Sequence, residues 1–175
     1  MTSQDPATHQ NVQFCLEGIG VTRPGWKTLV VAAAADTPAD PHEVWALWSD
    51  LGNWPSWSPL HQAAEWTGPP GFAAGATFDQ TLRLGFPAGT TTDHVTVDIA
   101  ETAHRASWSG NANGVRSCHL WTFTARAGGG TRIGNTEVFN GTVIGLTKPM
   151  LASRWRRQFQ QAVDALASRA APVRR

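Results

Sequence analysis

The sequence contains no tyrosine, only two cysteines and no long apolar run. Without tyrosine, an aromatic side chain that offers a polar atom must be one of the nine tryptophans. Cys15 and Cys118 are too few for a disulfide framework or a zinc site, so we expect two free thiols. No segment approaches the ~20 apolar residues of a membrane helix, and residues 1–10 lack the apolar region of a secretory signal. These absences predict a cytoplasmic protein without stable membrane insertion.

Charged residues are also scarce, at 15% of the sequence, and the net charge is +1. The one basic cluster, Arg154, Arg156 and Arg157, has the pattern of a solvated helix face, so nucleic acid is not an expected partner. The sequence has no phosphate loop, no nucleophile beside a base and no metal-spaced set of His, Cys and carboxylate residues. We therefore expect no metal and no other cofactor. The length of 175 residues suits a single domain, as a monomer or a homodimer.

The most strongly patterned segment is residues 142–168, which we predict to be one long amphipathic helix. At 100° per residue its large apolar side chains share one stripe, which holds Leu151, Trp155, Phe159, Ala162, Val163 and Leu166. Because isolated helices are marginal, this stripe must pack against the rest of the chain. Pro149 either begins the helix proper or kinks a longer one.

The remaining segments predict an α+β fold. Residues 1–25 read as a loose N-terminal extension, with a short edge strand at residues 12–16 as an alternative. Residues 26–169 form the domain, and residues 170–175 a disordered tail. Asp40, Pro41 and Glu43 predict a capped helix start, and a second short helical turn or stiff loop follows at residues 53–59. Apolar runs at residues 27–35, 61–66, 77–84, 92–100, 104–110, 115–125 and 131–139 predict a curved antiparallel sheet of six to seven strands.

Turn chemistry fixes part of the strand register. Asn113-Gly114 predicts a two-residue hairpin that sets Trp108 opposite His119. If residues 128–130 form a three-residue loop, Glu137 lies opposite Trp121, and a slip of two places it opposite His119 instead. Either register leaves the same side chains on one face, because only a slip of one changes faces. A turn near residues 88–89 would set Gln80 opposite Val97. A turn at residues 101–102 would set Val97 opposite Ala106.

One face of the sheet is apolar enough to be covered by the long helix, yet it also carries Gln80, His119, Asn135 and Glu137. Unpaired charges in an apolar core cost several kcal/mol, so a cavity that admits water or a polar ligand explains them better than a dry core. Glu137 and His119 are the candidate catalytic pair. The candidate binding residues are Trp108, Trp121, Phe123, Asn135, Gln80, Phe78, Leu82, Val95, Trp57, Leu151, Trp155 and Phe159. Structural roles stay open for all of these residues. Trp54 and Trp57 either fill one end of the core or gate a pocket.

The order of elements resembles the helix-grip fold of the START/Bet v 1-like (SRPBCC) superfamily, and more closely its bacterial polyketide cyclase/dehydrase branch. The segments that carry the likeness are Pro41-His42-Glu43-Val44-Trp45, residues 54–59, His119-Leu120-Trp121-Thr122-Phe123, residues 129–133 and Glu137-Val138-Phe139-Asn140-Gly141. The resemblance implies a hydrophobic cavity between sheet and C-terminal helix.

Two functions remain open at this point. In the first, the protein binds a hydrophobic polyketide-like or polycyclic molecule and assists cyclisation or dehydration by general acid-base chemistry, as a lyase or isomerase. In the second, it is a non-catalytic carrier or sensor of a lipid, quinone or hormone-like ligand, and the polar residues only orient that ligand.

Overall fold

The computed structural model describes residues 6–85, 89–112 and 114–171. Its elements, in chain order, are α1 (Pro6–Gly18), β1 (Thr28–Thr37), α2 (Pro41–Trp48), the short 3-10 helix η1 (Leu51–Asn53), α3 (Trp54–Trp57), β2 (His61–Trp66), β3 (Thr77–Gly85), β4 (Gly89–Glu101), β5 (Arg105–Ala112), β6 (Val115–Ala125), β7 (Thr131–Asn140) and α4 (Thr142–Ala170). Of the predicted disordered tail, residues 172–175 lie outside the described residues, and Ala170 belongs to α4.

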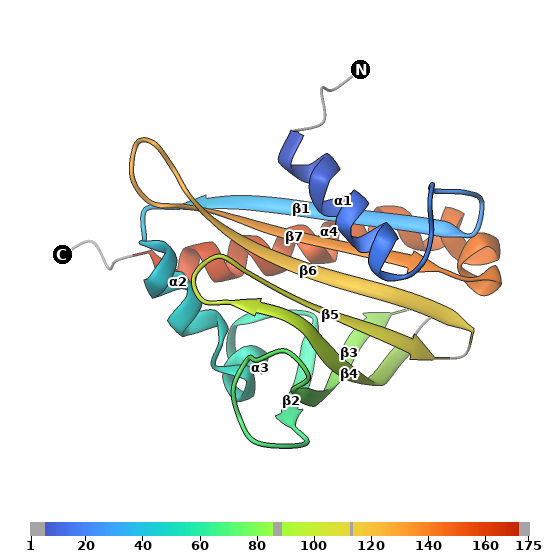
Figure 1. The fold of residues 1–175 in the computed structure, drawn as a ribbon, viewed down its shortest axis with the longest axis horizontal. Helices are drawn as coiled ribbons and strands as arrows, with labels where there is room; N and C mark the ends of the chain where they lie inside the picture. Colours follow the sequence, from blue (N-terminus) through green and yellow to red (C-terminus); the bar gives the residue numbers. More distant parts are fainter. Residues whose placement is uncertain (1–5, 86–88, 113, 172–175) are drawn as a thin grey trace.

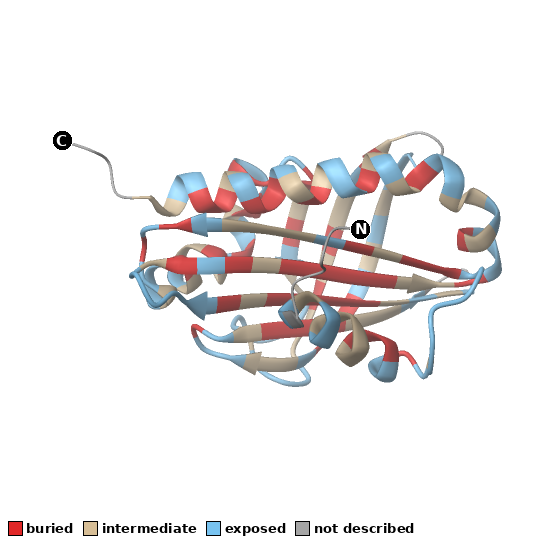
Figure 2. Ribbon diagram, turned by 90° about the horizontal axis from the view of Figure 1, so that it is seen from above, coloured by how far each residue is buried: buried red, intermediate tan, exposed pale blue. Residues whose placement is uncertain are grey.

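The seven strands form one antiparallel sheet in the order β1-β7-β6-β5-β4-β3-β2. Consecutive strands pair from β2 to β7, and β1 then adds to the far side of β7. Helix α4 lies along the inner face of this curled sheet, with α2 and α3 beside it, and α1 lies on the outer face (Figure 1, Figure 2). The predicted α+β helix-grip architecture is confirmed.

Local sequence explains how the inner helices form. The Asp40 carboxylate accepts the N–H of His42, and the Glu43 carboxylate accepts the N–H of Asp40, with Pro41 in the first turn. The predicted capping box is confirmed. Helix α4 continues through Pro149, which therefore lies inside one long helix rather than at its start.

The hairpin of β5 and β6 has the predicted register. Ala112 pairs with Val115, and Trp108 pairs with His119. The predicted turn residue Asn113 lies outside the described residues. This pairing places Trp108 and His119 on the inner face together.

The loop between β6 and β7 is longer than the predicted three residues. It spans residues 126–130 and is closed by the N–H of Arg126, which donates to the carbonyl of Gly130. Gly130 has a φ of 81°, in the left-handed region that glycine adopts without strain. The longer loop sets Glu137 opposite His119, the second of the two predicted registers.

The predicted register of β4 on β5 is wrong for two reasons: the connecting loop has three residues, 102–104, and the strand contains a bulge between Val97 and Ile99. Val97 pairs with Trp108, and the extra residue Asp98 reverses which side of the sheet the following side chains face. Ile99, which the sequence placed inside, therefore pairs with an outward-facing residue, and Ala100 packs against the core instead.

Residues 6–18 form helix α1 on β6 and β7, where the sequence predicted a loose extension or an edge strand. Cys15, Leu16 and Ile19 are buried there against Leu120 and Val138. Cys15 and Leu16 lie on the side of α1 that faces the sheet, and Ile19, directly after the helix, joins them there. The outer face, which the sequence predicted to be wet, is thus partly apolar.

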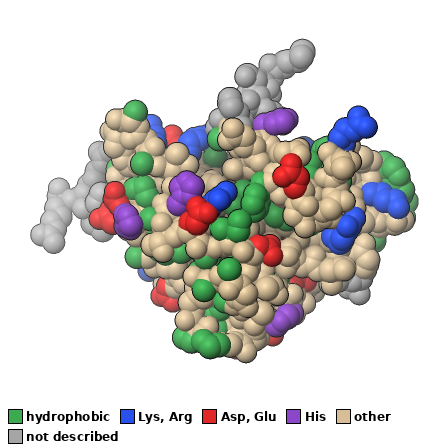
Figure 3. Space-filling view, viewed as in Figure 1, with side chains coloured by type: hydrophobic (Ala, Val, Ile, Leu, Met, Phe, Trp, Pro, Cys, Tyr) green, Lys and Arg blue, Asp and Glu red, His purple; other side chains and the backbone are tan. Residues whose placement is uncertain are grey.

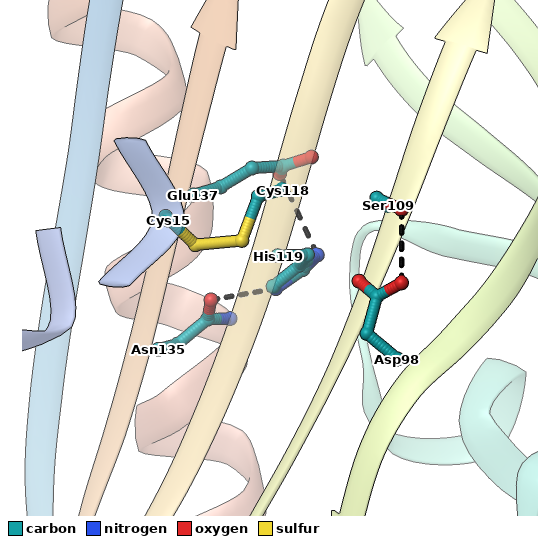
Figure 4. Close-up of a disulfide and its surroundings, with 7 residues drawn as sticks. All are labelled: Cys15, Asp98, Ser109, Cys118, His119, Asn135 and Glu137. Carbon is teal, nitrogen blue, oxygen red and sulfur yellow. Dashed lines mark hydrogen bonds and ion pairs between the residues drawn. A yellow bond between two sulfur atoms is a disulfide. The ribbon is translucent and has the colours of Figure 1, made fainter. Parts of the chain in front are cut away.

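Cys15 and Cys118 form a disulfide with a Cα–Cα distance of 5.2 Å (Figure 4). The prediction of two free thiols is wrong, because a separation of 103 residues in sequence said nothing about their separation in space. Cys118 does lie on the face opposite His119, as predicted, since neighbours on a strand point to opposite sides.

The inner face holds two apolar clusters, one at each end of the helix α4. At one end α2, α3 and the sheet enclose a group of aromatic rings, in which Trp48, Trp54 and Trp108 lie with centroids 5.6–6.3 Å apart. At the other end Leu29, Leu151 and their neighbours pack under the first half of α4. Each large apolar side chain buried in this way stabilises the fold by about 1.5–3 kcal/mol.

Candidate functional site

Glu137 and His119 meet at the middle of the inner face, as cross-strand neighbours on β7 and β6. Their side chains are only 8% and 6% exposed, and the Glu137 Oε2 lies 3.5 Å from His119 Nδ1. The other ring nitrogen, His119 Nε2, lies 2.6 Å from the Oδ1 of Asn135 (Figure 4). The three residues therefore form one buried polar group on two adjacent strands.

Burial lowers the pKa of His119 to about 3, although the hydrogen bond to Asn135 opposes this and nearby His61 adds to it. The imidazole is thus neutral at neutral pH. Because an amide oxygen only accepts hydrogen bonds, Nε2 carries the ring proton and donates it to Asn135. Nδ1 is then an unprotonated acceptor that faces Glu137.

Burial also raises the pKa of Glu137 well above its usual value, and the nearby Asp93 carboxylate raises it further. A carboxyl group whose pKa is raised in this way keeps its proton to a higher pH than an exposed one, which suits it to act as an acid. The arrangement places this carboxyl group beside a neutral imidazole, both in an apolar interior. Such a pair can deliver one proton and accept another while the net charge of the interior stays unchanged.

Further polar groups reach the same interior from β2, β3 and β4. Burial lowers the pKa of His61 to about 4, with neighbouring Gln80 opposing the shift, and His61 Nδ1 lies 2.7 Å from the hydroxyl of Ser58. Gln80 pairs with Asp93, not with the predicted Val97. Burial raises the pKa of Asp93 as well.

Aromatic rings surround the acid-base pair. The His119 ring lies 4.5 Å from Trp108, 5.9 Å from Trp121 and 5.6 Å from Phe159, between ring centroids. Trp155 packs instead on Phe139, at 4.7 Å. The aromatic candidate binding residues Trp108, Trp121, Trp155 and Phe159 thus come from β5, β6 and α4.

The predicted binding residues separate into two groups. Those in the aromatic cluster near α2 and α3 are Trp57, Phe78, Val95, Trp108, Trp121 and Phe123. Those in the second cluster, which includes α4 residues between Ile144 and Ala162, are Leu82, Leu151, Trp155 and Phe159. All are buried except Leu82, which is half-buried. Gln80 and Asn135 are buried polar residues, and Asn135 lies beside His119.

Several buried polar atoms of this interior lack a hydrogen-bond partner among the described residues. They include the indole nitrogens of Trp48, Trp57, Trp121 and Trp155, together with Asn135 Nδ2. Roughly 90% or more of buried polar groups in proteins are hydrogen-bonded, so this many unpartnered atoms in one region is unusual. They supply donors for a polar ligand.

Sequence reasoning missed His61, Ser58 and Asp93 as members of the site. Ala64 and Trp66 also face inward from β2, and strict alternation from them would turn Gln62 inward instead of His61; an irregularity between His61 and Ala63 reverses this. Trp54 was left open as a core plug or a gate. Its indole donates to the carbonyl of Trp48 and the ring packs within the aromatic cluster, as a core residue does.

Two pockets among the described residues lie on the outer face, away from this interior. One of about 490 Å³ adjoins the end of α1 near Ser109 and Arg116. The other, of about 270 Å³, lies between α1 and β1 near Val12 and Val30. In the described part of the chain no group of three or more His, Cys, Asp or Glu residues could hold a metal ion, and no helix is long and apolar enough to cross a membrane.

A curled antiparallel sheet with a long C-terminal helix along its inner face defines a helix-grip protein, and a buried polar pair lies on that inner face. The chain belongs to the family described as polyketide cyclase/dehydrase and lipid transport, whose model matches residues 28–171. No curated protein matches the chain by sequence.

Solved structures of the same fold include proteins with different roles. The Zhui aromatase/cyclase from Streptomyces is 14% identical, with a TM-score of 0.66, and the match covers 82% of this chain and 93% of that one. TTHA0849 from Thermus thermophilus is 16% identical, with a TM-score of 0.66 and coverage of 81% and 96%. Norcoclaurine synthase from Thalictrum flavum is 15% identical, with a TM-score of 0.62 and coverage of 84% and 96%. At these identities the likeness establishes the fold.

Proposed function

We propose that this protein binds a hydrophobic, polycyclic or polyketide-like molecule between the sheet and α4, and that Glu137 and His119 catalyse its cyclisation or dehydration. The observation that carries the proposal is the 3.5 Å contact between two buried groups, the Glu137 carboxyl and the His119 imidazole, whose other nitrogen lies 2.6 Å from Asn135 Oδ1. Burial raises the pKa of Glu137 and lowers that of His119, so both groups are shifted toward their neutral forms. The unpartnered polar atoms around this pair support a ligand with oxygen-bearing groups. The family match and the Zhui aromatase/cyclase agree with this substrate class.

The geometry suits the loss of water from a β-hydroxy ketone. His119 Nδ1 takes the proton from the carbon next to the carbonyl, and Glu137 gives its proton to the departing hydroxyl, which leaves as water. The electron pair of the broken C–H bond becomes the new double bond. The proton on Nδ1 then returns to the Glu137 carboxylate, 3.5 Å away, and both residues regain their starting states.

The dehydration of a β-hydroxytetralone to a naphthol tests the chemistry, because the aromatic product absorbs at longer wavelength. We expect Glu137→Gln and His119→Ala each to lower kcat by about 10²–10⁴-fold, the usual contribution of a general acid or base. Binding of the naphthol product, measured by quenching of tryptophan fluorescence, should change little. Glu65→Gln and His94→Ala, at exposed positions, are matched controls and should keep full activity.

The alternative function is a carrier or sensor of a hydrophobic ligand. If binding of the naphthol falls as much as turnover in both variants, the polar residues only orient a ligand, and the carrier function replaces the catalytic one. Full activity in Glu137→Gln would contradict the proposed mechanism directly.

A further inference from the structure

Exposed hydrophobic side chains gather at one end of the molecule. Among the described residues the large exposed ones are Trp26 (58%), Val143 (48%), Leu146 (71%) and Met150 (56%). The last three lie within 60° of one another around α4 at 100° per residue, so they form one stripe over its first two turns. These four residues are called the end patch below.

The end patch lies on the side of α4 that the sheet does not cover. Ile144 and Leu151, on the covered side, are buried in the apolar cluster that also contains Trp155 and Phe159. The start of α4 is therefore apolar both toward the interior and toward solvent. A helix that is apolar all round is normally buried, so the exposed stripe is a surface suited to being covered.

Trp26 is held in its exposed position by the fold. Its indole lies against the backbone of Gly145, and a side chain at Gly145 would collide with the ring. The Lys27 ammonium lies 5.3 Å from the centroid of the same indole. Glycine inside a helix costs about 0.5–1 kcal/mol relative to alanine, and here it leaves room for an exposed tryptophan.

The end patch is surrounded by positive charge. Arg23 and Lys27 precede β1, while Lys148 and Arg154 lie on α4, and residues 18–35 and 141–163 contain no Asp or Glu. The two lysines of the sequence are both in these segments. Figure 3 shows hydrophobic and basic side chains together at the right-hand end, where α4 begins in the view of Figure 1. The near-neutral whole molecule thus has one basic, apolar end.

We propose that the end patch docks onto the surface of an anionic lipid membrane. An exposed Trp with neighbouring Leu, Met and Val side chains suits the boundary between headgroups and acyl chains, and the flanking Lys and Arg suit anionic headgroups. Of the four side chains of the end patch, only the Trp26 indole can donate a strong hydrogen bond, which favours an apolar lipid boundary over a protein partner recognised by directed hydrogen bonds. The proposal does not depend on the catalytic role of Glu137 and His119.

Co-sedimentation with vesicles tests the proposal. One set contains phosphatidylcholine alone and the other equal parts of phosphatidylcholine and phosphatidylglycerol. We expect binding to the anionic vesicles that weakens with salt. Arg23→Gln and Lys27→Gln should each weaken it about fivefold, from the contribution of one cation near an anionic surface. Arg169→Gln, which removes an exposed arginine from the far end of α4, should bind as the wild type does.

The apolar contribution is tested with Leu146→Gln and Met150→Gln, at exposed positions where a polar side chain can be accommodated. Each should weaken vesicle binding at least as much as the loss of one cation. Brominated lipids should quench part of the tryptophan fluorescence of the wild type, and that part should be absent in Trp26→Phe.

Three results would overturn the proposal. The first is no binding of the wild type to either kind of vesicle. The second is binding of Leu146→Gln and Met150→Gln to the anionic vesicles that is as tight as that of the wild type. The third is a wild-type dimer that Leu146→Gln converts to a monomer, because a second copy of the chain would then cover the patch. Retention of vesicle binding in Glu137→Gln, whatever its activity, keeps this test separate from that of the proposed function.

Discussion

Reduction of the Cys15–Cys118 disulfide should lower the free energy of unfolding by about 4–5 kcal/mol. The cross-link spans 103 residues, and closing a loop of about 100 residues removes about 4.7 kcal/mol of chain entropy from the unfolded state at 25 °C. Measured losses for native disulfides are typically about 2–5 kcal/mol, so the expected value lies at the upper end. For a domain of this size it corresponds to a fall in Tm of about 10–20 °C.

Urea unfolding, followed by the fluorescence of the tryptophans, measures this loss in oxidised and reduced protein. The double variant Cys15→Ala/Cys118→Ala should resemble the reduced wild type, and a reducing agent should not change it further. After reduction only apolar contacts such as those of Leu16 and Ile19 hold this segment on the sheet. The amides of α1 should therefore exchange faster with solvent, while those of β6 stay protected.

The reasoning fails if the oxidised and reduced proteins unfold at the same urea concentration. It also fails if mass spectrometry of protein purified without reductant, with free thiols alkylated, finds both cysteines modified. That second result would agree with the predicted cytoplasmic location, where thiols are normally kept reduced, and the location itself stays a prediction.

Three further predictions concern pH and local structure. In unfolded protein the pKa of His61 returns to near 6.5, whereas in the fold it is about 4. Between these values the unfolded state binds more protons, so stability falls as pH is lowered. The free energy of unfolding, measured with urea at pH 6.5 and at pH 4, should fall by about 3 kcal/mol less in His61→Asn than in the wild type. Asp40→Ala removes the cap of α2 and should cost about 1 kcal/mol, with an unchanged folded-state circular dichroism spectrum. Gly130→Ala combines a φ of 81° with overlap of Cβ on the Thr37 carbonyl, and should cost more than the ~1 kcal/mol of a left-handed residue alone, seen as a lower Tm.

The sequence predicted the fold because its strongest signals are local. The apolar stripe of α4, the capping residues Asp40 and Glu43, and the Asn113-Gly114 turn each depend on neighbours in the chain. Alternation along β6 and β7 then places His119 and Glu137 on the same face in either predicted register.

What the sequence did not predict depends on contacts between distant segments. The bulge at Asp98 reverses the facing of Ile99 without any glycine or proline to mark it. The pairing of Cys15 with Cys118 requires a helix where the amphipathic signal is weak. His61 faces the interior because an irregularity between His61 and Ala63 interrupts the alternation of β2. Alternation with Val95 does place Asp93 on the inner face, but only its position near Glu137 makes it part of the site.

Cys118 and His119 are consecutive residues that serve opposite sides of one strand, the first anchoring a helix outside and the second facing the interior. Inserting or deleting a single residue between Gly114 and Cys118 would exchange their directions, turning a sulfur toward the indoles and an imidazole toward α1. Residues 114–118 should therefore tolerate substitutions better than they tolerate the insertion or deletion of a residue.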